Sequence, residues 1–191
     1  MIFRAVEDAD LISRARLGDV EAFNALVSRW EKRVFNYLLR LTASREDALD
    51  LSQDAFLKAY QNLRELDDPA RFGPWLYRIA HNEAYSHFRR RRPETVLPEI
   101  ADFERAAAAA AGPAFSPDLS LAVTAALDRL TPEQREAVVL KVYEGFKFEE
   151  MAEILDTPVS TIKSRLYSAL DVLKGELAPV KAPLNNPRGA R

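Results

Sequence analysis

Residues 148–174 read FEEMAEILDTPVSTIKSRLYSALDVLK, and this stretch decides the fold. Apolar residues recur at helical spacing on both sides of a break around Thr157 and Pro158, which predicts a helix, a four-residue turn and a second helix. The first of these helices is acidic, whereas the second carries basic and hydroxyl side chains in its first turns. This division is typical of a helix-turn-helix, whose second helix enters the major groove of DNA.

The second helix separates an apolar face from a polar face. Its expected buried stripe consists of Ile162, Leu166, Ala169, Leu170 and Leu173. Lys163, Ser164 and Tyr167 are left facing outward, and Ser160 is expected to be the N-cap. The candidate DNA contacts on this helix are Ser160, Thr161, Lys163, Ser164, Arg165 and Tyr167. A helical hairpin with a solvated polar face explains the same pattern, so the spacing alone leaves both interpretations open.

A second candidate for nucleic-acid binding lies upstream, at residues 72–92, FGPWLYRIAHNEAYSHFRRRR. At about 100° per residue, Arg78, Asn82, Tyr85 and Arg89 fall within about 40° of one another on a helix. Such a face can follow a phosphate backbone, stack a base and hydrogen-bond to its edge. Arg90 and the neighbouring arginines strengthen this interpretation, although basic residues at a helix C-terminus also suit the helix dipole. A solvated face with a buried tyrosine is the alternative.

Asp8 or Asp10 can cap a short first helix that stops at Gly18, and two further helices are expected between it and this one. Asp19 caps a long amphipathic helix, and Ser44 begins another that runs to about Leu63. The second of these helices carries an acidic stripe, in which three aspartates fall within roughly 60° of one another next to a glutamine. The stripe consists of Asp47, Asp50, Gln53 and Asp54. It can be a docking surface for a basic partner, a solvated face, or a set of catalytic or metal-binding carboxylates.

Catalytic and metal chemistry find no further support in the sequence. There is no glycine-rich loop and no Ser/His/Asp constellation, and His81 and His87 would lie on different faces of their helix. We therefore expect no catalytic residue, no metal and no cofactor, and we expect that the protein is not an enzyme.

Prolines, a run of six alanines and scattered acids occupy residues 93–118 and predict a flexible linker. Order returns at Leu119, where Thr131-Pro132-Glu133-Gln134 forms a capping-box pattern ahead of a helix to about Tyr143. Residues 178–191 are expected to be a disordered tail. The fold class is therefore all-α, with two small helical domains, 1–92 and 119–177, of which the second is a helix-turn-helix. Nothing in the linker fixes an angle, so we expect these domains to move independently.

Composition limits the possible partners and the location. The chain has 191 residues, a net charge of −2 and no cysteine. Residues 1–92 carry 16 basic and 14 acidic side chains, residues 93–117 carry 1 and 4, and residues 118–191 carry 10 and 11. No part is basic enough to bind DNA by bulk electrostatics alone, so we expect either that something else assists DNA binding or that the DNA contacts are few and local. With no signal sequence and no membrane span, we expect a soluble cytoplasmic protein.

These motifs, in this order, resemble an extracytoplasmic-function (ECF, group IV) sigma factor of bacterial RNA polymerase. GDVEAFNALVSRWEKRVFNYLLRLTASREDALDLSQDAFLKAY, residues 18–60, is similar to the opening helices of conserved region 2. FGPWLYRIAHNEAYSHFRRRR is similar to the part of region 2 that melts the promoter and reads the −10 element. LDRLTPEQREAVVLKVYEGFKFEEMAEILDTPVSTIKSRLYSAL, residues 127–170, is similar to region 4, which reads the −35 element.

The resemblance implies partners and residue roles. It implies that the protein binds the clamp and flap of core RNA polymerase, recognises and opens promoter DNA, acts in a stress response and is controlled by an anti-sigma factor. It places the acidic stripe at the clamp helices, Asn82 at an unpaired −10 base and Arg78 and Arg89 near the DNA backbone. It places Lys163, Ser164, Arg165 and Tyr167 on the −35 recognition helix. It also implies that the acidic linker threads a basic channel of the polymerase.

Two other kinds of protein remain possible from the sequence. A self-sufficient helix-turn-helix regulator would bind a palindromic duplex tightly without polymerase. A metal-dependent enzyme using the aspartates of the acidic stripe would lose activity with a chelator and ignore DNA.

Overall fold

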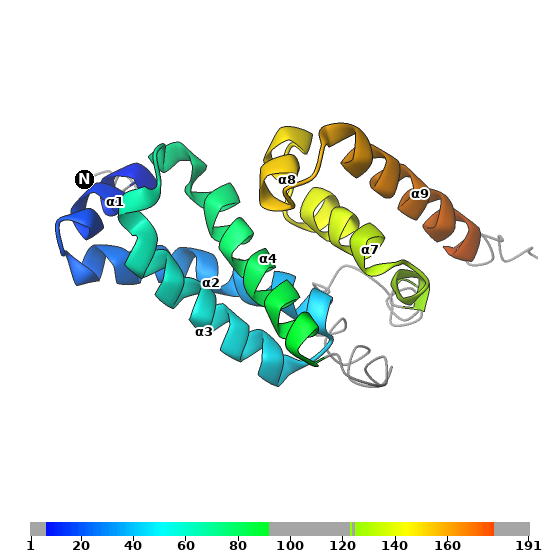
Figure 1. Cartoon of the computed structure of the whole chain (residues 1–191), viewed down its shortest axis with the longest axis horizontal. Helices are drawn as coiled ribbons and strands as arrows, with labels where there is room; N and C mark the ends of the chain where they lie inside the picture. Colours follow the sequence, from blue (N-terminus) through cyan, green and yellow to red (C-terminus); the bar gives the residue numbers. More distant parts are fainter. Residues whose placement is uncertain (1–6, 92–122, 124, 178–191) are drawn as a thin grey trace, which may run out of the picture.

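The computed structural model describes residues 7–91, 123 and 125–177, and every regular element in these residues is a helix (Figure 1). This confirms the predicted all-α class. The expected linker at 93–118 and the expected tail at 178–191 lie outside the described residues. The helices form two groups, one on each side of the gap in the described chain.

The first group consists of four α-helices and two short 3-10 turns: α1 (Asp8–Arg16), α2 (Val20–Thr42), α3 (Arg45–Asn62), η1 (Leu63–Glu65), η2 (Pro69–Arg71) and α4 (Phe72–Arg91). The caps predicted at Asp19 and Ser44 are confirmed. The Asp19 side chain accepts a hydrogen bond from the Ala22 N–H (3.1 Å), and the Ser44 hydroxyl accepts one from the Asp47 N–H (3.2 Å). These bonds satisfy N–H groups that a helix start leaves without intrahelical partners.

Large apolar side chains from α1, α2 and α4 form the core of this first domain. Ile12, Leu26, Leu38 and Leu76 are fully buried there. Gly73 allows α4 to begin close to α2, because a Cβ at this position would lie 2.7 Å from the Trp30 ring. The close approach fixes α4, and therefore its arginine-rich end, against the rest of the domain.

The second domain contains a short helical stretch at residues 125–128, then α7 (Pro132–Val138), a π-helical turn η3 (Val139–Tyr143), α8 (Phe148–Ile154) and α9 (Val159–Leu177). The predicted capping box is present, since Thr131 and Gln134 exchange hydrogen bonds between side chain and backbone (3.3 and 3.0 Å). A four-residue turn joins α8 to α9, as predicted, and Asp156 in this turn has a left-handed backbone (φ 46°). Asp tolerates that conformation better than most residues.

One detail of this second domain differs from the sequence expectation. We expected Ser160 to cap the recognition helix, but α9 begins at Val159, two residues earlier than a cap at Ser160 would give. The Pro158 carbonyl accepts the first hydrogen bonds, from the N–H groups of Thr161 and Ile162. Proline has no N–H of its own, so the chain enters the helix there without leaving another unsatisfied donor. Ser160 is therefore an exposed residue of the first turn.

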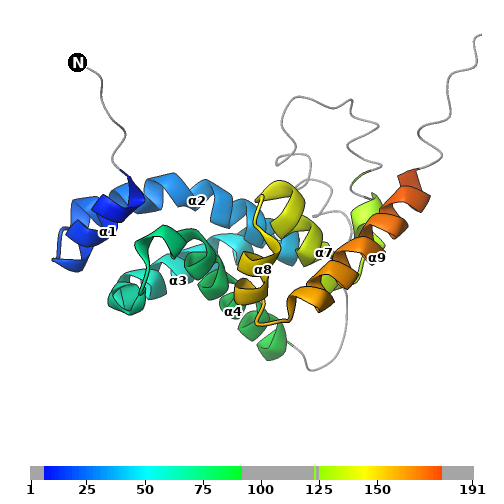
Figure 2. The ribbon, with the colours of Figure 1, turned by 90° about the horizontal axis from the view of Figure 1, so that it is seen from above.

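The two domains pack against each other. Both views show α8 beside α4 and the α7 region next to the first domain (Figures 1 and 2). Phe146, between η3 and α8, lies edge-on to Tyr77 of α4 with ring centroids 4.8 Å apart. The Arg40 guanidinium stacks 4.2 Å above the Tyr143 ring. We expected the domains to move independently, and this interface was not predicted from the sequence.

Candidate nucleic-acid interface

The polar face of α9 is open to solvent. Lys163, Ser164 and Tyr167 are exposed, as predicted, and so are Ser160 and Thr161. The Lys163 ammonium lies 5.2 Å from the centre of the Phe148 ring, which gives this cation a weak tether to α8. Helix α9 therefore presents a hydroxyl- and amine-bearing surface of the kind that contacts phosphates and base edges.

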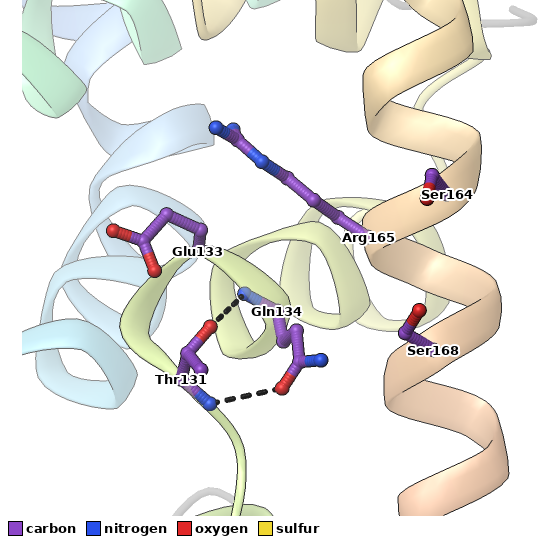
Figure 3. Close-up of a pocket in the computed structure, with 6 residues that line it drawn as sticks. All are labelled: Thr131, Glu133, Gln134, Ser164, Arg165 and Ser168. Carbon is purple, nitrogen blue, oxygen red and sulfur yellow. Dashed lines mark hydrogen bonds between the residues drawn. The ribbon is translucent and has the colours of Figure 1, made fainter.

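Arg165 lies apart from the other candidate DNA contacts of α9. It is half-buried, and Figure 3 shows its side chain running from α9 past the start of α7, while Ser164 and Ser168 stay close to α9. These residues line a shallow hollow with Thr131, Glu133 and Gln134. On a helix, Arg165 is about 200° from Lys163, so the two cations cannot share one face. In this arrangement Arg165 is directed toward the first domain.

The predicted face of α4 is present, and one of its members has a partner in the other domain. Arg78, Asn82, Arg89 and Arg90 are exposed. Tyr85 is 37% exposed, and its hydroxyl donates a hydrogen bond to Glu136 Oε2 of α7 (3.0 Å). The charged and amide groups of this face are thus accessible to solvent, whereas the hydroxyl of Tyr85 is hydrogen-bonded to the second domain.

The acidic stripe on α3 divides into exposed and paired members. Asp50, Gln53 and Asp54 are exposed, whereas Asp47 is half-buried and lies 3.5 Å from His87 Nε2 of α4. From the sequence, all four residues were predicted to lie on one surface, because helical spacing shows which residues share a face but not what covers that face. The outermost three form the accessible part of the stripe.

Three exposed apolar side chains on α3 escaped the sequence analysis. Leu49, Leu57 and Tyr60 are 42%, 56% and 43% exposed. They lie on the same helix as the acidic stripe and outside its core-facing side. Apolar residues outside the core-facing stripe of this helix were the sequence signal by which they could have been found. Exposed apolar side chains beside exposed carboxylates are typical of a protein-docking surface.

A buried carboxylate at the domain interface was also missed. Glu136 of α7 has a side chain only 2% exposed, and three groups of the first domain contact it. Tyr37 Oη lies 2.6 Å and His81 Nδ1 2.8 Å from Oε1, and Tyr85 Oη lies 3.0 Å from Oε2. Burial raises the pKa of Tyr37 and Tyr85 above the ordinary tyrosine value, and the neighbouring Glu136 charge raises it further.

These tyrosines make the free energy of unfolding depend on pH in the alkaline range. Burial, followed by the charge of Glu144, raises the pKa of Tyr77 as well. Because folding raises all three pKa values above the unfolded value near 10, the neutral hydroxyls stabilise the folded chain fully below pH 10. That contribution is lost as the pH rises above 10, since each phenolate would face a carboxylate.

We therefore expect urea unfolding to show a falling free energy of unfolding between about pH 9 and about pH 11. Tyr85→Phe should make this fall shallower, because it removes one of the three titrating hydroxyls. An equal slope in the two proteins would show that the Tyr85 hydroxyl does not contribute to the alkaline loss.

The described residues contain no group of three or more His, Asp or Glu side chains arranged to bind a metal ion. Among the same residues, no helix is both long and apolar enough to cross a bilayer.

In the comparison with known proteins, both domains match regions of the same protein family, sigma-70. Residues 26–94 match the family model for sigma-70 region 2, and residues 120–173 match that for sigma-70 region 4. The chain is 33% identical over 183 residues to an ECF RNA polymerase sigma-E factor of Haemophilus influenzae, covering 91% of this chain and 96% of that protein. It is 30% identical over 184 residues to RNA polymerase sigma-H factor of Pseudomonas aeruginosa, covering 91% and 95%.

Two solved structures are similar to most of the chain. One is CnrH in complex with the cytosolic domain of CnrY, with a TM-score of 0.66, 27% identity and coverage of 92% of this chain and 99% of that one. The other is the sigma factor RpoE in complex with the anti-sigma factor NepR from Bartonella quintana. For it the TM-score is 0.65, the identity 26% and the coverage 82% and 96%.

Proposed function

Because the chain belongs to the ECF family of RNA polymerase sigma factors, we propose that it acts as an alternative sigma factor through the surfaces described above. In this role it binds core RNA polymerase, brings it to a set of promoters and helps to open the −10 element. The observation that best supports the assignment of surfaces is the exposure of polar groups on two helices. Helix α4 lies in the region 2 match and α9 in the region 4 match.

Each surface takes a role that suits its chemistry. The exposed part of the acidic stripe, with Leu49, Leu57 and Tyr60 beside it, docks on a basic surface of the polymerase. Arg78, Arg89 and Arg90 contact the DNA backbone, while Asn82 and Tyr85 bind an unpaired −10 base. The outward face of α9, from Ser160 to Tyr167, contacts the −35 duplex. The polymerase supplies most of the electrostatic affinity, which agrees with the net charge of −2.

Sigma factors are transcription initiation factors, and we propose that this chain has no catalytic activity of its own. It acts where the polymerase acts, in the cytoplasm. Two of its structural relatives are bound to CnrY and to the anti-sigma factor NepR. We propose by analogy that an anti-sigma factor also regulates this chain.

The −35 role of α9 is testable with a matched pair of lysines. Lys163→Ala should weaken binding of the reconstituted holoenzyme to promoter duplex. A lost base contact costs about 1–3 kcal/mol and relaxes sequence preference, whereas a lost phosphate contact weakens all sequences alike. Lys174→Ala removes an exposed lysine from the last turn of the same helix and should have no such effect. Filter binding to a library of −35 variants distinguishes the two kinds of contact, and equal behaviour of the two variants would exclude Lys163 from the −35 surface.

A further inference from the structure

The aromatic ring of Phe148, the first residue of α8, contacts two ammonium groups. Lys141 Nζ lies 4.9 Å from the centre of the ring, and Lys163 Nζ lies 5.2 Å from it. Both distances are within the roughly 6 Å at which the negative face of an aromatic ring attracts a cation. Lys163 is one of the proposed −35 contacts, so the supporting helix α8 contacts the DNA surface of α9 through this ring.

The Phe148 ring is held in a fixed position. Glu150 Oε2 accepts a hydrogen bond from the Lys147 N–H (2.7 Å), which fixes the first turn of α8. The ring itself is partly buried and packs against the hydrophobic core. Lys141 is fixed as well, since its ammonium donates a hydrogen bond to the Phe146 carbonyl (2.9 Å). The ring is therefore a rigid partner for the longer and more exposed side chain of Lys163.

This kind of partner leaves the charge and the hydrogen-bond donors of Lys163 available. Within the described part of the chain Lys163 forms no ion pair, although the neighbouring helix α8 is rich in glutamate. Lys58, by contrast, donates its ammonium hydrogen to the carboxylate of Glu83. An aromatic ring attracts an ammonium group without neutralising it as a carboxylate does, so the N–H donors of Lys163 remain free for a phosphate or a base edge.

We propose that Phe148 is a positioning residue for Lys163, whose ammonium it holds at the −35 surface of α9 before DNA binds. A lysine side chain loses much rotamer freedom when it becomes ordered. The ring already restricts this freedom in the unbound chain, so less is lost on binding and the affinity rises without any contact between Phe148 and DNA. The inference rests on the proposed function, because that function assigns Lys163 to the −35 element, and it adds a residue of α8 to the same role.

A double-mutant cycle with the reconstituted holoenzyme tests this role. The probe is a duplex fragment that carries the −35 element of a promoter identified by run-off transcription. Phe148→Leu keeps an apolar side chain but removes the ring, and it should weaken binding about twofold to fivefold, the range expected for an exposed cation–π contact. The same change in a Lys163→Met chain should have no effect on binding, because no ammonium remains to be positioned. Phe148→Tyr keeps the ring and should retain the affinity of the unaltered chain.

Lys141 provides the matched control, because it contacts the same ring from η3. Lys141→Met should leave −35 binding unchanged, and Phe148→Leu should weaken binding equally in the Lys141→Met chain and in the unaltered chain. An equal loss from Phe148→Leu with and without the Lys163 ammonium would mean that Phe148 acts only through the packing of its domain, and it would overturn the proposal. So would unchanged or tighter binding by Phe148→Leu, or a loss of affinity in Phe148→Tyr.

The contact itself is measured in the free full chain, without DNA or polymerase. In NMR spectra the ε-methylene protons of Lys163 should resonate upfield of those of Lys174, an exposed lysine of the same helix, because they lie near the face of the Phe148 ring. Phe148→Leu should remove this shift, and Phe148→Tyr should keep it. Equal resonances for the two lysines in the unaltered chain would overturn the proposal even if Phe148→Leu failed to fold. Failure of the proposed function is seen separately, as a lack of −35-dependent binding by holoenzyme that contains the unaltered chain.

Discussion

Asn82→Ala should leave promoter duplex binding intact and severely reduce promoter opening. Asn82 is exposed on α4, and its amide can donate to and accept from the edge of an unpaired base. Taking a base out of the stack costs a few kcal/mol, so loss of the group that binds the base lowers the population of open complex. A loss of about 2 kcal/mol corresponds to roughly thirtyfold fewer open complexes.

Permanganate footprinting on duplex and pre-melted templates measures this directly. The pre-melted template removes the cost of unstacking and should restore open-complex formation by Asn82→Ala. It should not restore binding by Lys163→Ala, whose defect lies upstream in duplex DNA. Asn24→Ala, at an exposed asparagine of α2, is the control. Normal opening of the duplex by Asn82→Ala, or no rescue on the pre-melted template, would remove Asn82 from the −10 surface.

Asp50→Arg combined with Asp54→Arg should abolish binding to core polymerase while helicity stays intact. Both aspartates are exposed on α3, so reversing their charge leaves the core unchanged. Like charges placed opposite each other at a docking surface cost several kcal/mol. A cost of about 3 kcal/mol alone weakens binding on the order of a hundredfold. The association rate should fall most at low salt, because the two arginines repel the basic surface of the polymerase and salt screens that repulsion.

The matched control is Glu31→Arg combined with Glu65→Arg. It makes the same change of charge at exposed positions of the same domain, outside α3. Surface plasmon resonance with immobilised core polymerase compares the two double variants. Equal affinities would mean that the acidic stripe on α3 does not dock on the polymerase, whatever the total charge of the domain.

Much of the fold could be predicted because its signals are local. Asp19, Ser44 and Thr131 each satisfy N–H groups within three residues of themselves, so the sequence alone identifies where α2, α3 and α7 begin. The turn between α8 and α9 is similarly set by Asp156 and Pro158. Ser160 was misassigned as the N-cap because a proline before the helix start competes with a good capping residue two positions later.

The contacts between the domains could not be predicted in the same way. Glu136 lies in a helix of acidic and basic residues and looks like any solvated glutamate. Its partners, Tyr37, His81 and Tyr85, are 51 to 99 residues away in the sequence. Helical spacing gives the face of a residue but not its neighbours in another domain. The same limit applies to Arg165, which belongs to the recognition helix yet points toward the first domain.

The contact between Asp47 and His87 could not be predicted from the sequence for the same reason, since it depends on how two helices pack. Both residues were identified on their own helices, one as part of the acidic stripe and the other as a histidine without a metal partner. Only the packing of α3 against α4 brings them to 3.5 Å.

The central claim, that this chain directs RNA polymerase to promoters, is tested most directly by run-off transcription. Purified core polymerase is incubated with a pool of genomic promoter fragments, with and without the full chain. The account predicts discrete transcripts from a subset of fragments only when the chain is present, and none of them with Asp50→Arg and Asp54→Arg. Identical transcripts with and without the chain, or tight binding of the chain alone to a palindromic duplex with no effect on transcription, would contradict it.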